Sequence, residues 1–85
     1  MLRAVTVTVK LFAAYQEAYG QPEVVLELPE GTTMGEVCDR ICAPYPELKT
    51  LKPITRYGIN LAFVEADTPI QNGDEVVLIP PVSGG

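Results

Sequence analysis

The sequence predicts a small α+β fold, and three patterns carry that prediction. Val5, Val7 and Val9 alternate with polar residues near the N-terminus, a period of two that is typical of a β-strand. Residues 33–43 instead repeat apolar side chains at helical spacing. Residues 75–79 form a nearly continuous apolar run, which suits a central strand buried on both faces. Strands toward both ends of the chain with a helix between them indicate the α+β class.

The N-terminal third predicts an antiparallel hairpin with a long connection. Residues 12–19 follow the first strand and are rich in alanine and other good helix formers. Gly20 is placed to end that short helix as its C′ residue. Residues 23–28 then predict the second strand, bounded by Pro22 and Pro29.

The main helix has a start signal and a stop signal. Thr33 and Glu36 match a capping box, in which each side chain bonds the other residue's backbone N–H. Pro44 and Pro46 limit the helix to residues 33–43. The apolar residues on one face of this helix are Met34, Val37, Cys38, Ile41 and Cys42. We expect this face to cover one side of a sheet.

The C-terminal half predicts short strands separated by turns. Residues 49–53 suggest a polar connection, and residues 57–60 and 63–65 suggest short strands with a turn at Asn60. Turn residues continue to Asn72-Gly73, just before the apolar strand. A mixed sheet packed by one main helix is a β-grasp arrangement. We therefore expect a single β-grasp domain over residues 1–79 and an extended, flexible C-terminal Gly-Gly tail over residues 80–85.

Composition excludes several kinds of function. Six basic and eleven acidic residues give a net charge of −5, which argues against nucleic acid as a partner. The chain has no histidine, so it lacks the usual triads and most catalytic zinc sites. No apolar run approaches a membrane span, so we expect no membrane partner and a cytoplasmic location.

The two cysteines, Cys38 and Cys42, lie four residues apart in the predicted helix. Their Cβ atoms should then be about 5–6 Å apart, whereas a disulfide needs about 3.5–4.5 Å. We expect two small buried thiols, no disulfide and no metal site.

The last six residues suggest a reactive tail. An extended chain of this length reaches about 20 Å, and Pro80 and Pro81 would keep its base extended. Gly84 and Gly85 lack a Cβ, so the tip could thread a narrow channel and present the Gly85 carboxylate. The alternative is a frayed, inert terminus.

The sequence resembles a known family over essentially its whole length. The matching segments are Leu11-Phe12-Ala13, Asn60, Gly73-Asp74-Glu75-Val76 and Leu78-Ile79-Pro80-Pro81-Val82-Ser83-Gly84-Gly85. They resemble the MoaD-type sulfur carriers of molybdopterin synthase, in the MoaD/ThiS family with its ubiquitin-like β-grasp fold. The Pro-Pro pair before the Gly-Gly terminus favours this type over ThiS-type thiamine carriers. The chain departs from the family at Gln16, where an arginine is common.

The resemblance implies a substrate-like subunit without a self-contained catalytic site, and no cofactor bound by this chain. A MoeB-type adenylating enzyme would use ATP and magnesium to adenylate the Gly85 carboxylate. A sulfur donor would then displace AMP and leave a thiocarboxylate. The tail would enter a large, MoaE-type subunit in a two-plus-two heterotetramer and donate sulfur to cyclic pyranopterin monophosphate, in molybdenum cofactor biosynthesis.

The resemblance also assigns roles to individual residues. Gly85 would carry the sulfur. The residues that would position the tail are Pro80, Pro81, Val82, Ser83 and Gly84. The expected contacts to the large subunit are Phe12, Phe63 and Ile79, for which the alternative is ordinary core packing.

Three other functions stay open. A ThiS-type carrier would share the activation chemistry and deliver sulfur to thiazole synthesis. A ubiquitin-like modifier would be joined through Gly85 to lysines of target proteins. A plain interaction module would have an inert tail.

Overall fold

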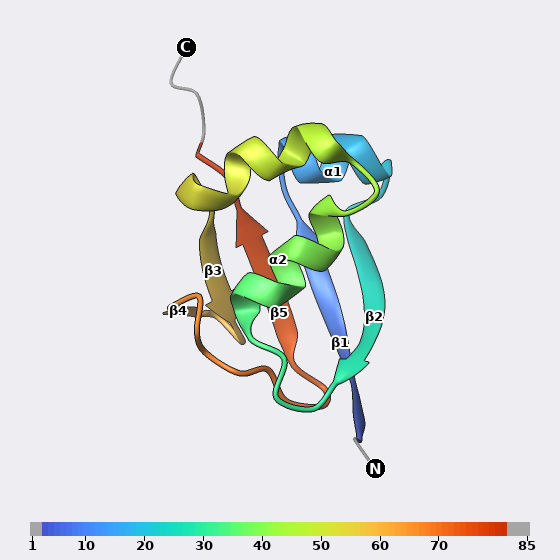
Figure 1. The fold of residues 1–85 in the computed structure, drawn as a ribbon, viewed down its shortest axis with the longest axis vertical. Helices are drawn as coiled ribbons and strands as arrows, with labels where there is room; N and C mark the ends of the chain where they lie inside the picture. The colour runs from blue at the N-terminus through green and yellow to red at the C-terminus, as the bar shows by residue number, and fades with distance from the viewer. Residues whose placement is uncertain (1–2, 82–85) are drawn as a thin grey trace.

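The computed structural model describes residues 3–81 of the chain, and its fold is α+β (Figure 1). The tail residues Val82, Ser83, Gly84 and Gly85 lie outside the described residues, so the roles assigned to them remain expectations. Within residues 3–81, no helix is both long and apolar enough to cross a membrane.

A five-stranded mixed sheet runs through the molecule in the order β2-β1-β5-β3-β4. The central strands β1 and β5 are parallel, and the other neighbours are antiparallel. The strands are β1 (Ala4–Leu11), β2 (Glu23–Pro29), β3 (Arg56–Ile59), β4 (Ala62–Val64) and β5 (Glu75–Ile79). The helices are α1 (Ala14–Tyr19), α2 (Met34–Cys42) and the 3₁₀ helix η1 (Pro46–Ile54). Helix α2 crosses one face of the sheet, which confirms the predicted arrangement (Figure 1).

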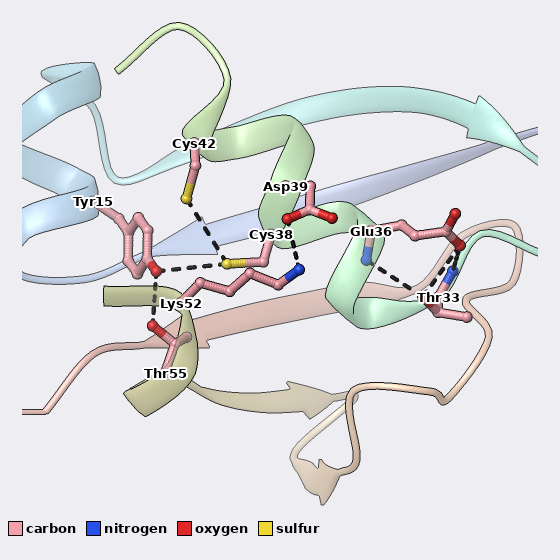
Figure 2. Close-up of polar contacts among 8 residues, drawn as sticks. All are labelled: Tyr15, Thr33, Glu36, Cys38, Asp39, Cys42, Lys52 and Thr55. Atoms are coloured by element: carbon pink, nitrogen blue, oxygen red, sulfur yellow. Dashed lines mark hydrogen bonds and ion pairs between the residues drawn. The ribbon is translucent and has the colours of Figure 1, made fainter. Parts of the chain in front are cut away.

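Helix α2 has the predicted start, end and buried face. Thr33 Oγ1 accepts a hydrogen bond from the Glu36 N–H at 3.3 Å, and Glu36 Oε1 accepts one from the Thr33 N–H at 2.9 Å (Figure 2). The helix ends at Cys42 with Ala43 as its C-cap, just before Pro44. Its five predicted apolar residues are all buried in the core, together with Val9 and Leu78 of the central strands.

Both cysteines are free and buried, as predicted. Their sulfur atoms lie 4.0 Å apart (Figure 2). That distance is about twice the length of a disulfide bond.

The first helix and the connection after α2 differ from the prediction. Helix α1 begins at Ala14 instead of residue 12, because Ala13 has a positive φ of 51° and the Tyr15 N–H bonds the Phe12 carbonyl in a turn. The connection expected at residues 49–53 lies inside η1, which buries Leu48 in the core. Leu48 is the one buried residue of η1, so the sequence of this segment has no apolar periodicity from which a helix could be predicted.

The prediction that the strand at residues 75–79 is buried on both faces was also wrong. Val76 and Leu78 are buried against α2, but Val77 and Ile79 on the opposite face are only half-buried. Helix α2 covers one face of the sheet only, so the other side of this apolar run is left open.

Candidate functional site

The open face of the sheet, on the side away from α2, carries an apolar hollow. Strand register sets Phe63 of β4 opposite Gly58 of β3, and Gly58 opposite Val77 of β5. Paired residues point to the same side of a sheet, so these three positions form one row on the open face. The hollow encloses about 250 Å³ and is lined by Phe12, Gly58, Leu61, Ala62, Phe63, Val77 and Ile79. We call this the sheet hollow.

Gly58 forms the floor of the sheet hollow. A Cβ at this position would lie 3.0 Å from Val77 Cγ2 and 3.4 Å from the Ala62 carbonyl oxygen. Any side chain would therefore press on Val77 and fill the space between Phe63 and Val77. The depth of the hollow depends on glycine at this position.

A second apolar hollow adjoins the first at the C-terminal end of β5. It encloses about 340 Å³, is lined by Phe12, Ala13, Ile79 and Pro80, and is called here the tail-base hollow. Phe12 and Ile79 line both hollows. Pro80 is buried and Pro81 is exposed, so the chain leaves the sheet beside this hollow.

The structure brings together the three residues predicted to contact a partner. Phe12 and Phe63 are 45% and 72% exposed, and Ile79 is half-buried between them and the tail base. An exposed cluster of this kind is typical of a protein-binding surface, because isolated apolar side chains rarely surround a common hollow. The ordinary-core alternative does not fit Phe12 or Phe63.

Sequence patterns missed the other members of the sheet hollow. Gly58 and Val77 face each other only because of the register between β3 and β5, which no local pattern encodes. Leu61 was not predicted as a surface residue of this site, because a single apolar residue beside a turn belongs to no periodic pattern. The Asn60 side chain fixes this turn: its Nδ2 donates to Asp74 Oδ1 at 3.1 Å, and its Oδ1 accepts from the Glu75 N–H at 3.1 Å.

The buried thiols form a different cluster, on the helix side of the sheet. The Tyr15 hydroxyl lies 2.7 Å from Thr55 Oγ1 and 3.6 Å from Cys38 Sγ (Figure 2). Burial raises the pKa of the Cys42 thiol to about 11, and burial also raises the pKa of Tyr15. Cys42 and Tyr15 therefore stay protonated at neutral pH, and both side chains are buried in the core, so they serve packing.

Ion pairs and acidic groups build no further site in the part of the chain that the structure describes. Lys10 pairs with Glu23 at 2.7 Å and Lys52 with Asp39 at 2.6 Å, both at the surface. Among residues 3–81 no cluster of three or more His, Cys, Asp or Glu side chains is placed to hold a metal ion. The site that remains is an apolar surface next to the start of the tail.

Comparison with known proteins identifies the family. The model of the ThiS family matches residues 9–85, which include the last three residues of β1, all of β2 to β5 and positions 80–85. The chain belongs to the ThiS family. Membership accounts for the β-grasp topology of the sheet and helix α2.

Four curated relatives of the chain share one name. A molybdopterin synthase sulfur carrier subunit from Mycobacterium tuberculosis is 32% identical over 82 residues, covering 95% of this chain and 99% of its own length. Subunits with the same name from Arabidopsis thaliana, Dictyostelium discoideum and Chlamydomonas reinhardtii are 30%, 28% and 31% identical.

Solved structures of a small archaeal modifier protein and of a ubiquitin share the fold. Small archaeal modifier protein 1 from Methanosarcina acetivorans is 28% identical, with a TM-score of 0.75 over 98% of this chain and 99% of that protein. A ubiquitin from Caldiarchaeum subterraneum is 21% identical, with a TM-score of 0.66 over 98% of this chain and all of that protein. The ubiquitin-like β-grasp prediction is confirmed.

Proposed function

We propose that this chain is the sulfur carrier subunit of a molybdopterin synthase. The observation that carries the proposal is the similarity to curated carrier subunits over 95% of the chain, together with a family match that runs to Gly85. The Pro-Pro-Val-Ser-Gly-Gly sequence at positions 80–85 supplies the chemistry that such a subunit needs.

The reacting group is the Gly85 carboxylate. A carboxylate is a poor acyl donor, so a MoeB-type partner would transfer AMP from ATP to it, with magnesium, and release pyrophosphate. A sulfur donor would then attack the acyl carbon and expel AMP, leaving a thiocarboxylate. Its sulfur would form a bond to cyclic pyranopterin monophosphate, and water would then cleave the acyl–sulfur bond, leaving the sulfur on the acceptor and regenerating the carboxylate. Pro80, Pro81, Val82, Ser83 and Gly84 position the tail in this scheme.

The partner that receives the tail is a large, MoaE-type subunit, in a two-plus-two assembly. The four residues after Pro81 span at most about 14 Å, so a site that accepts Gly85 must lie close to the tail base. A subunit that close would cover the tail-base hollow and contact Phe12 and Ile79. Phe63 extends the same contact along the sheet hollow. The large subunit would supply the acid–base groups for the transfer.

The test is the intact mass of the protein after incubation with ATP, magnesium, a sulfur donor and the adenylating enzyme of the same organism. We expect the gain of one sulfur in place of one oxygen, localised to the C-terminal peptide. A variant lacking Gly84-Gly85 is the matched control and should stay unmodified. An unchanged wild-type mass, with a known carrier modified in parallel, would contradict the proposal.

Conjugation to proteins is the second candidate function. The solved modifier from Methanosarcina acetivorans, at 28% identity, favours it because that protein shares the fold and nearly the whole length. A tagged chain expressed in its own organism would then form isopeptide-linked products through Gly85. Detection of such products by peptide mass spectrometry would support this function. If the chain were instead a ThiS-type carrier, it would restore thiazole synthesis in a strain that lacks its own carrier.

A further inference from the structure

The β3–β4 hairpin displays a leucine in an unfavourable backbone conformation. Ile59 pairs with Ala62, so the hairpin loop has two residues, Asn60 and Leu61. Both have positive φ, 49° and 74°, the combination of a type I′ turn. Asn suits the first position, but the second strongly prefers glycine. Leu61 occupies it with a side chain that is 99% exposed.

This arrangement is unfavourable for stability in two ways. A left-handed conformation at a residue with a Cβ costs about 1–2 kcal/mol. Full exposure also means that the leucine side chain gains nothing from burial in the isolated chain. The turn is nevertheless held firmly, because the Asn60 N–H donates to the Glu75 carbonyl at 2.9 Å and the Asn60 side chain bonds both Asp74 and Glu75.

Strain of this kind is confined to the open face. Among residues 3–81, the non-glycine residues with positive φ are Ala13, Asn60 and Leu61. Asn tolerates this conformation, which leaves Ala13 and Leu61 as the strained positions. Ala13 lines the tail-base hollow and Leu61 lines the sheet hollow. Strained residues cluster at functional sites, where a binding requirement fixes them.

We propose that Leu61 is an anchor residue that inserts into an apolar pocket of the large subunit. This inference rests on the proposed function and extends its interface from the tail base to the β3–β4 turn. Leu61 shares the sheet hollow with Phe12 and Ile79, and those two residues also line the hollow from which the tail departs. A partner seated over the tail base therefore reaches Leu61 along one continuous apolar surface, and the fixed turn presents the side chain without an ordering cost.

The test separates the side chain from the backbone strain. Leu61→Gly removes the apolar side chain and introduces the residue that this turn position prefers. Leu61→Asn also removes the apolar side chain, and asparagine tolerates a positive φ. Val25→Thr is the control, since Val25 is 64% exposed at the β2 edge of the sheet, outside both hollows. Thermal unfolding and calorimetric titration with the large subunit of the same organism are measured for each full-length variant.

We expect Leu61→Gly to raise Tm by about 2–6 °C and to weaken binding of the large subunit about tenfold or more. Leu61→Asn should also weaken binding without lowering Tm, and Val25→Thr should bind like the wild type. If Leu61→Gly binds the large subunit as tightly as the wild type, this inference is overturned and the proposed function is not. A lowered Tm in both Leu61 variants has the same consequence. Failure of the wild-type chain to bind the large subunit overturns the proposed function as well. The wild-type chain could instead self-associate, with Leu61→Gly abolishing this self-association and leaving the affinity for the large subunit unchanged. That result would identify a second copy of the chain as the partner of Leu61 and would overturn the inference.

Discussion

The Tyr15 hydroxyl donates a hydrogen bond of 2.7 Å to Thr55 Oγ1, across 40 residues of sequence. The direction follows from Thr55, whose single hydroxyl hydrogen is donated to the Leu51 carbonyl at 2.7 Å. This chain of hydrogen bonds joins α1 to the end of η1 inside the core (Figure 2). It holds the element that follows Phe12 against the segment that leads into β3.

Substitutions of these two residues should differ in effect. Thr55→Val leaves the Leu51 carbonyl without this partner and the Tyr15 hydroxyl with only the weak Cys38 thiol, and we expect a loss of about 1–3 kcal/mol in the free energy of unfolding. Tyr15→Phe leaves the Thr55–Leu51 bond intact and should cost about 1 kcal/mol. Urea unfolding at pH 7 measures both. Thr50→Val is the control, since its hydroxyl bonds the Glu47 carbonyl at the exposed surface. A larger loss in Tyr15→Phe than in Thr55→Val would contradict the assigned direction.

Gly58→Ala should damage both stability and docking. The added Cβ would lie 3.0 Å from Val77 Cγ2, and we expect a loss of about 1–2 kcal/mol as the two groups move apart. The methyl group also raises the floor of the sheet hollow, so affinity for the large subunit should fall. Combining Gly58→Ala with Val77→Ala should cost less than the sum of the two single changes. Strict additivity would show that these side chains do not meet.

Phe63→Ala should affect binding without affecting the fold. Phe63 is 72% exposed, so we expect its removal to change the free energy of unfolding by about 0.5 kcal/mol or less. Loss of an aromatic group at the centre of an apolar interface should weaken large-subunit binding about tenfold or more. Ile54→Ala is the matched control, because Ile54 is 56% exposed on η1, outside both hollows. Equal affinities of these two variants would exclude Phe63 from the interface.

The chain should lose stability in mildly alkaline solution. Burial raises the pKa of Cys42 from 9.0 to about 11, so the folded state favours the neutral thiol. The buried neutral thiol contributes fully to the free energy of unfolding below pH 9. This contribution declines as the pH rises from 9 toward 11, because the Cys42 thiol of the unfolded chain ionises at a lower pH than that of the folded chain. We expect a loss of about 1 kcal/mol by pH 10 in urea unfolding. Cys42→Ala should show a shallower decline between pH 8 and 10, and the same slope in both proteins would refute the assignment.

Deletion of Gly84-Gly85 should separate folding from sulfur transfer. Among residues 3–81 the last buried residue is Pro80, and we expect the truncated chain to keep its Tm and its affinity for the large subunit. It should acquire no sulfur and support no molybdopterin synthesis in a reconstituted system. Synthesis at the wild-type rate would show that the tail is inert.

Local signals made the helix side of the molecule predictable. The Thr33–Glu36 capping box, the prolines after Ala43 and the apolar face all lie within one short segment, and they fixed α2 nearly to the residue. The alternating valines likewise predicted β1, and the structure buries all three of them. Sequence resemblance, rather than periodicity, brought Phe12, Phe63 and Ile79 together as one surface.

Features that depend on the register between strands were beyond local patterns. An apolar run such as residues 75–79 reads the same whether one face or both are covered, so the open side of β5 was not predicted. The row from Phe63 through Gly58 to Val77 exists only after β3, β4 and β5 have paired. The positive φ of Ala13 and Leu61 contradicts local propensity, which is why neither strained residue was predicted.

The parallel pairing of β1 with β5 has a consequence for biosynthesis. Strand β1 leaves the ribosome before β5 and must wait for it, because β5 lies between β1 and β3 in the sheet. The nascent chain therefore cannot close its core until residue 79 has emerged. A partner that recognises the folded open face would thereby ignore chains in which β5 has not yet emerged.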